Sequence, residues 1–493
     1  MRLRPSAFRR LSCAVRARRA IIHAPELCRQ ERGISTSEQR HARRWLLFAE
    51  SRFFLVESRI AVIAQRVAAC LLLLLLLAAC TTTAAQAPQN PTEPAGASRS
   101  GVTLVLWHGW SSVARQTLSH LVDQFNRQHP DGQIVLQPVP LATFDSDLRG
   151  ALAAGSGPHI VLLPSTWVGS LAATDALLPL DDLLPAAEQR AIIQPGLGGG
   201  RARGADGKQR LYAWPISIDT LALYYDKRNF LTPPADTAAL LQNAHGLGAP
   251  DATPPRWGLA LNLSVETTIG YLYAAGGQIF DNDGKLVLGS AGRAGAERWL
   301  GWLAQLKDDK QLLARADSSI EVDRELKDGH VLMTFDWAHQ LGFYRSLWGE
   351  NLGVAQLPIL SATKQPPVPY VRGDVLAINS RASAAEREAA LAFLRFMTGA
   401  DAQHALLLSD LQPALADLPL DSSDLDAGQI MAAQAFRAQA ALGRPMPNAP
   451  TPERDLLRRE LAQMQRQVLR GEANPAEAVS EADQHLREQL GTP

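Results

Sequence analysis

Apolar strands alternate with amphipathic helices where the long body of the chain begins. Between Leu118 and Phe125, for example, apolar residues recur at helical spacing. The pattern predicts strands at 102–107, 133–139 and 160–163, with helices between them. Such strand–helix–strand repeats predict an α/β fold with a mainly parallel sheet flanked by helices. Ligands bind to sheets of this kind beyond the carboxyl ends of the strands.

Carboxylates in apolar surroundings mark further candidate positions. Asp219 lies in the stretch 211–225, which we interpret as a strand with alternating sides. A carboxylate in such a strand needs a partner or a ligand, unless it sits on an edge that faces solvent. Glu266 begins a predicted helix, and Asp336 follows a predicted strand at 330–335. The charge-rich tail, 455–490, is interpreted as helices with solvated faces.

The run LLLLLLLAAC at 71–80 indicates a secretory signal. Arg59 and Arg66 precede it, and its apolar core is shorter than the roughly 20 residues that span a bilayer. Residues 77–80 resemble a bacterial lipobox, which implies a diacylglycerol group on Cys80 and export. The alternative is a buried leucine-rich helix. We expect residues 1–79 to be a leader, of which the first 50 or so residues are not translated.

Composition separates the leader from the exported part. Fifteen of the 49 basic residues but only five of the 49 acidic ones precede Cys80, so the remainder is acidic, which argues against a nucleic-acid partner. Cys80 is the last cysteine, which leaves no disulfide and no cysteine-based metal site, and we expect no cofactor. Residues 80–101 are rich in Thr, Ala and Pro and predict a lipid-anchored flexible tether.

Several stretches together resemble a known family. The most telling are LVLWHGWSS (104–112), GSGPHIVLLP (155–164), YAWPISIDTLALYYDKRNF (212–230) and DGHVLMTFD (328–336). In their order and spacing they resemble the extracellular solute-binding proteins of ABC importers, of the maltose-binding-like type. The resemblance implies a two-lobed periplasmic-binding-protein-like fold of type II, with a hinge, over residues 102–493.

The resemblance also implies where the lobes and the hinge lie. We expect lobe 1 at about 102–218 plus 375–415, and lobe 2 at about 220–370 plus 416–493. The chain would cross between them near 218–221, near 370–375 and once more after residue 410.

Matching the family's motifs gives a set of candidate ligand-binding residues. They are Trp110, Ser111, Ser112, Thr166, Trp167, Asp219, Glu266, Asp336, Trp337, Tyr370, Arg372 and Gly373. The aromatic contact after Asp336 is either Trp337 or His339. His159 stands where the family usually has an acidic residue, and Arg372 stands where the hinge usually has a small one.

The chemistry of these residues suits carbohydrates. Tryptophan offers a flat apolar face to a sugar ring, and a carboxylate accepts hydrogen bonds from hydroxyls, each worth roughly 1.5–3 kcal/mol. Four tryptophans lie near predicted strand ends and are otherwise core residues: Trp110, Trp167, Trp214 and Trp337. We expect at least two of them to contact ligand.

The favoured hypothesis is therefore a receptor that delivers a sugar or oligosaccharide to an ABC permease. It would be a monomeric lipoprotein on the outer face of the cytoplasmic membrane or its periplasmic side. One alternative is a binding protein for a non-sugar solute, such as a polyol phosphate, polyamine or peptide, because Arg372 would suit an anion. The other is an exported glycoside hydrolase, since Asp219, Glu266 and Asp336 could imitate a pair of opposed carboxylates. The sequence has neither a G-x-S-x-G nor an H-E-x-x-H motif.

Overall fold

The computed structural model describes residues 101–281, 283–316 and 319–491. The predicted leader, Cys80 and almost all of the predicted tether lie outside the described residues. Within the described part of the chain, no helix has the length and apolar character needed to cross a membrane.

The first sheet has the strand order β2-β1-β3-β14-β6. The chain forms β1 (Val102–His108), β2 (Gly132–Pro138) and β3 (Ile160–Pro164) in succession, and these three are parallel. The late strand β14 (Asp374–Ile378) lies antiparallel between β3 and β6 (Ala213–Pro215). The sheet is therefore mixed, because its fourth strand returns from a distant part of the chain.

Helices that cover this first lobe bury one apolar stripe each. In α4 (Ser112–Gln128), Leu118, Leu121, Val122 and Phe125 are buried, as the spacing predicts. Phe125 meets Phe393 of α14 (Ala384–Met397) edge-on, with ring centroids 5.1 Å apart. The remaining elements of lobe 1 are α5 (Phe144–Ala154), η1 (Ser165–Trp167), α6 (Val168–Ala172), α7 (Ala186–Arg190), α8 (Gln194–Gly199), β4 (Arg201–Arg203), β5 (Gln209–Leu211) and α15 (Ala400–Leu408).

The second sheet has the order β10-β9-β11-β8-β12. Its strands are β10 (Leu313–Arg315), β9 (Ala260–Asn262), β11 (Met333–Trp337), β8 (Leu221–Asp226) and β12 (Leu352–Ala355). Every residue of β8 is buried. Leu223 belongs to the core on one face of β8, and Tyr224 to the core on the other. The stretch 211–225, interpreted as one alternating strand, is divided into β6, the short segment Ser217–Ile218 and β8, so Asp219 lies between strands. Helices cover both faces of β8.

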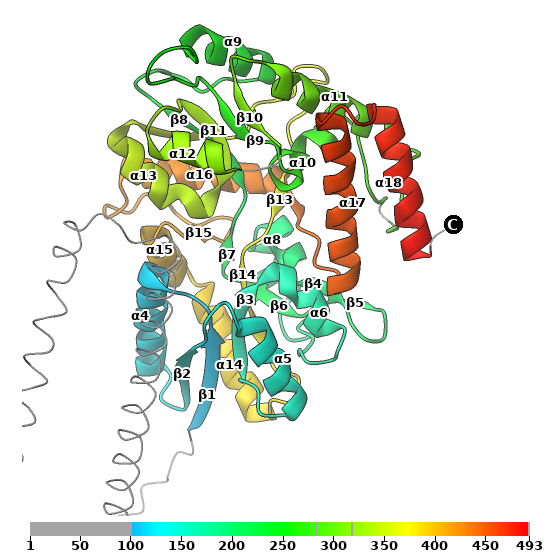
Figure 1. Ribbon diagram of the computed structural model, residues 1–493. Helices are drawn as coiled ribbons and strands as arrows, with labels where there is room; N and C mark the ends of the chain where they lie inside the picture. Colours follow the sequence, from blue (N-terminus) through cyan, green and yellow to red (C-terminus); the bar gives the residue numbers. More distant parts are fainter. Residues whose placement is uncertain (1–100, 282, 317–318, 492–493) are drawn as a thin grey trace, which may run out of the picture. The chain divides into compact units, whose positions relative to one another are not determined.

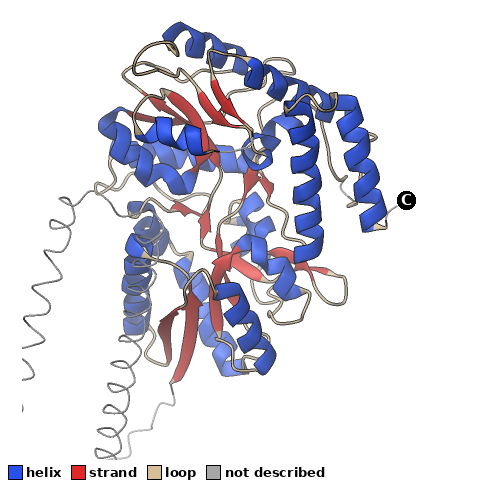
Figure 2. Ribbon diagram, in the orientation of Figure 1, coloured by secondary structure: helices blue, strands red, loops and turns tan. Residues whose placement is uncertain are grey.

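Two groups of helices enclose the second sheet (Figures 1 and 2). One core includes residues of α10 (Val265–Ala274), α11 (Arg293–Asp308), α17 (Thr451–Leu469) and α18 (Pro475–Leu490). The other includes residues of α12 (Ile320–Lys327), α13 (Leu341–Trp348) and α16 (Ala427–Leu442). The second lobe also holds α9 (Thr237–Leu247) and the short η2 (Ala338–Gln340) and η3 (Gly349–Asn351).

Short paired segments connect the two sheets. β7 (Ser217–Ile218) pairs with β15 (Gln412–Pro413), and β13 (Tyr370–Val371) pairs with β16 (Arg444–Pro445). Between them, Asp219 and Arg372 form an isolated bridge, with Asp219 N donating to Arg372 O at 2.7 Å. We refer to these segments as the hinge; they overlap the predicted crossings near 218–221 and 370–375.

The charge-rich tail does more than present solvated faces. The body of α17 packs on lobe 2, where Leu461 and Met464 join the core. Just before the helix, the Asn448 amide donates to Gly199 O of lobe 1 at 2.8 Å. Arg454 then donates to Thr166 O at 2.6 Å. Helix α17 thus keeps a row of exposed residues, as the charge pattern indicates, and its other side contacts both lobes.

Candidate ligand-binding cleft

Two adjoining cavities lie where the lobes meet. The first, of about 330 Å³, is lined by Thr166, Trp167, Val265, Glu266, Tyr370, Arg372, Met446, Pro447, Arg454, Asp455, Leu457, Arg458 and Leu461. The second, of about 420 Å³, is lined by Leu141, Pro164, Ser165, Thr166, Ser217, Ile218, Asp219, Ala338, His339, Arg372, Gly373, Asp374, Asp410, Leu411 and Gln412. Because Thr166 and Arg372 line both, we treat the two cavities as one cleft. Each volume suits a small ligand.

The first cavity combines aromatic, apolar and charged groups. Trp167, the last residue of η1 after β3, lines this cavity, and its ring packs against that of Phe144, with ring centroids 5.8 Å apart. Tyr370 comes from the hinge, and Glu266 from the first turn of α10. A loose ion pair, Arg458 Nη1 to Glu266 Oε1 at 3.9 Å, connects α17 with α10. This arrangement offers a ring for stacking beside donors and acceptors for hydroxyl groups.

Helix α17 is the part of the cleft that the sequence analysis missed. It supplies Arg454, Asp455, Leu457, Arg458 and Leu461 to the first cavity. A signal was present, because Arg454 and Arg458 are four residues apart, as are Leu457 and Leu461, so each pair shares a helix face. The pattern alone could not say that this face looks into a cleft.

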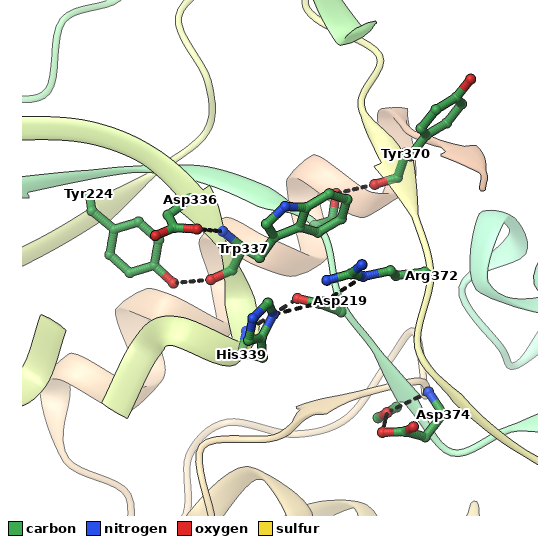
Figure 3. Close-up of polar contacts among 10 residues, drawn as sticks. Asp219, Tyr224, Asp336, Trp337, His339, Tyr370, Arg372 and Asp374 are labelled. Atoms are coloured by element: carbon green, nitrogen blue, oxygen red, sulfur yellow. Dashed lines mark hydrogen bonds and ion pairs between the residues drawn. The ribbon is translucent and has the colours of Figure 1, made fainter. Parts of the chain in front are cut away.

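Asp219, which lines the second cavity, is the centre of a network of polar contacts (Figure 3). Its Oδ2 accepts a hydrogen bond from Arg372 Nε at 2.9 Å and contacts His339 Nδ1 at 3.0 Å. Its Oδ1 accepts from the His339 backbone N at 3.2 Å. The Arg372 guanidinium stacks over the Trp337 ring, 4.1 Å from its centroid. Within the structure, then, the predicted acidic ligand contact already has protein partners.

These contacts shift two pKa values in opposite directions. Burial acts to raise the pKa of Asp219, but its bonds with His339 and Arg372 outweigh burial and hold that pKa below its usual range. The hydrogen bond to Asp219 raises the pKa of His339 above its usual value, against the effect of burial. The charged pair is therefore favoured over the neutral one.

A second partly buried carboxyl group, that of Asp374, lines the same cavity. Its backbone N donates to Ser217 Oγ at 3.1 Å, and Ser217 Oγ lies 3.5 Å from Asp374 Oδ2. Burial raises the pKa of Asp374 to about 6. Nearby, Asp410 Oδ1 accepts from Arg345 Nη1 at 2.9 Å. The second cavity is therefore rich in carboxyl groups.

The structure does not bring every candidate to these cavities. Ser111, at the N-cap position of α4, and Ser112 are exposed, while Trp110 packs against the lobe 1 core. Asp336 lies behind the cleft, where it accepts from Tyr344 Oη at 2.8 Å, and burial raises its pKa. Neither Asp336 nor Trp337 lines either cavity, and Trp337 is only 8% exposed.

Two other residues also lie apart from the cleft lining. Trp214 is 1% exposed and donates from Nε1 to Thr398 Oγ1 at 3.1 Å, so it is a core residue. His159 accepts from Val105 N at 2.9 Å and lies 3.2 Å from Glu386, at the opposite end of β3 from Thr166. Of the four tryptophans, Trp167 is the one that lines a cavity.

Comparison with known proteins identifies the family. Residues 120–432 match the model for bacterial extracellular solute-binding proteins. The chain belongs to this family. A maltotriose-binding protein of Pyrococcus abyssi is 24% identical over 179 residues, which are 36% of this chain and 38% of that protein. An sn-glycerol-3-phosphate-binding periplasmic protein of Pectobacterium atrosepticum is 25% identical over 142 residues, 28% of this chain and 31% of that protein. The chain thus spans less than two fifths of these curated relatives.

Solved structures of solute-binding proteins share the fold. The maltose/maltodextrin-binding domain of Bdellovibrio bacteriovorus, bound to maltotriose, superposes with a TM-score of 0.60 at 22% identity, covering 79% of this chain and all of that one. A cyclo/maltodextrin-binding protein with maltotetraose gives 0.68 at 20% identity, covering 81% and 99%. The expectation of a two-lobed α/β fold of the solute-binding type is confirmed.

Proposed function

We propose that this solute-binding protein captures a carbohydrate between its two lobes and passes it to the permease of an ABC importer. The observation that carries the proposal is a cleft lined from both lobes, the hinge and α17, with Trp167 beside Glu266 and carboxyl groups at the hinge. A ring stacked on indole and hydroxyls bonded to carboxylates are the usual means of holding a sugar. Relatives named for maltotriose and maltodextrin binding support the same solute class.

A phosphorylated polyol is the second candidate. Three guanidinium groups, of Arg372, Arg454 and Arg458, line the first cavity, where Glu266 and Asp455 are the carboxylates. Arginine suits phosphate because its planar fork can bind two oxygens at once. The relative named for sn-glycerol-3-phosphate binding points the same way.

Hydrolysis is disfavoured by the placement of the carboxylates. Asp336 lies off both cavities, and Asp219 is already held by Arg372 and His339. A glycosidase needs two carboxyl groups on opposite sides of one bond. We therefore propose a binding role without turnover.

A thermal-shift panel tests the choice of ligand. Full-length protein is heated with glucose, maltose, maltotriose, maltotetraose, sn-glycerol 3-phosphate or spermidine. A ligand that binds the folded state alone raises the melting temperature, and the rise grows with the logarithm of its concentration relative to its dissociation constant. We expect a saccharide to give the largest shift. A shift with sn-glycerol 3-phosphate alone would favour the second candidate, and no shift with any saccharide would contradict carbohydrate capture.

We also propose that the protein is exported as a lipoprotein and remains monomeric. The lipobox-like residues 77–80 and the family's extracellular character support export and anchoring. Cys80→Ala should move the protein from the membrane to the soluble fraction, because the acyl chains supply the anchoring energy. Cys70→Ala, within the leader, is the matched control and should stay with the membrane. If the Cys80→Ala variant were still found in the membrane fraction, the proposed lipid anchor on Cys80 would be contradicted.

A further inference from the structure

The Asp219 carboxylate has little room left for a ligand. It takes part in three hydrogen bonds, two with His339 and one with Arg372. A carboxylate has about four acceptor positions, so about one remains. Asp219 nevertheless lines the second cavity. A ligand with two neighbouring hydroxyls needs two acceptor positions there, and one of the protein's own bonds has to be given up.

The two partners of Asp219 are not held equally firmly. Arg372 is joined to Asp219 by a pair of backbone hydrogen bonds of 2.7 and 3.0 Å, and its guanidinium stacks on Trp337. The His339 side chain lies on the short η2, and 49% of it is exposed, against 34% for Arg372. The imidazole is therefore the partner that a ligand can displace at least cost.

The charges around His339 are mainly negative. Asp219 is in direct contact and Asp336 is close in sequence, with Arg372 as the nearby positive group. The other ionisable groups at this cavity are Asp374 and Asp410, and Asp410 is paired with Arg345. The bond with Asp219 contributes most to the raised pKa of His339. A protonated imidazole makes a stronger, charge-assisted bond to a carboxylate than a neutral one.

We propose that His339 is a proton-controlled gate on Asp219, which a ligand must displace in order to bind. Protonated His339 holds Asp219 more tightly and so weakens ligand binding. Displacement of the imidazole removes its carboxylate partner and releases a proton to the solvent. This inference rests on the proposed function, because it requires a ligand with hydroxyl groups that uses Asp219.

The expected pH window follows from linkage. The empty protein has the raised His339 pKa, and the bound protein a value nearer the ordinary one of about 6.5. Affinity therefore falls as the pH is lowered through the raised pKa, and it levels off below the ordinary value. Asp374, with a pKa of about 6, titrates mostly below this window.

Calorimetry of the full-length protein tests the gate. The saccharide of the panel above that gives the largest thermal shift is titrated at pH 6.5 and 8.5, in buffers of different ionisation enthalpy. For the wild type we expect the dissociation constant to be at least about threefold larger at pH 6.5, with net proton release. His339→Gln keeps an amide donor for Asp219 but cannot titrate, so both effects should vanish. Asp374→Asn should retain both.

Each outcome of this experiment bears on the proposal. Equal affinity at the two pH values in the wild type, or an unchanged pH dependence in His339→Gln, overturns the gate and leaves carbohydrate capture standing. Loss of the pH dependence in Asp374→Asn but not in His339→Gln also overturns it. If no saccharide binds the wild type at either pH, the proposed function and the gate fall together.

Discussion

At the scale of single residues, one carboxyl group of the cleft, that of Asp374, lowers the stability of the folded protein when it is charged. Asp374 is half-buried, and desolvation raises its pKa to about 6, above the unfolded value of about 3.9. A carboxyl group whose folded pKa is raised favours the fold while it is protonated. That contribution is complete below about pH 3.9 and is lost as the pH rises through about 6. At neutral pH, the charged Asp374 therefore destabilises the empty protein.

Asp374→Asn should remove this cost. A pKa difference of about two units corresponds to roughly 2–3 kcal/mol, so the free energy of unfolding should rise by about 2 kcal/mol at pH 8 and change little at pH 4. Denaturant unfolding at both pH values measures it. Asp251→Asn, at an exposed position, serves as the control. An equal gain at the two pH values would show that removal of the charge is not the cause.

At the scale of elements, the hinge depends on a close backbone approach that only glycine permits. A Cβ atom on Gly373 would lie 2.1 Å from Ser217 O, so β13 and β14 could not pass β7 at their present distance. Gly373→Ala should lower the free energy of unfolding by about 2 kcal/mol or more, since backbone has to shift. Gly301→Ala, in α11 with nothing near its Cβ position, should stabilise the protein slightly. If Gly373→Ala were as stable as the wild type, the close approach of residue 373 to Ser217 O would not restrict the hinge.

Helix α17 gives a second prediction at this scale. Arg458 and its neighbour Arg459 are both exposed, but Arg458 lines the first cavity with Glu266 and Arg459 lines neither cavity of the cleft. Arg458→Ala should weaken saccharide binding about tenfold, because a charged hydrogen bond is worth about 1.5–3 kcal/mol. Arg459→Ala should leave the affinity unchanged. Calorimetric titration compares the two, and equal effects would mean that this face of α17 does not contact ligand.

At the scale of the whole molecule, local sequence patterns predicted several helices and strands of the first lobe correctly. Helical spacing placed α4 correctly, and the strand–helix alternation predicted the parallel strands β1 to β3. The sequence analysis did not predict the pairings between distant residues. β14 lies antiparallel to β3 in the first sheet. The Asp219 side chain is bonded to His339 and Arg372, and Arg454 of α17 donates a hydrogen bond to Thr166 O. No local period encodes such contacts, because they depend on how the finished lobes meet.

The central claim is that a carbohydrate binds between two lobes, which then close on it. A ligand that contacts both lobes binds the closed form better and shifts the population toward it. Small-angle X-ray scattering of the wild type measures this most directly, without and with a saturating concentration of the panel saccharide that binds most tightly. The account predicts a smaller radius of gyration with ligand. An unchanged radius at proven saturation would contradict binding in the cleft.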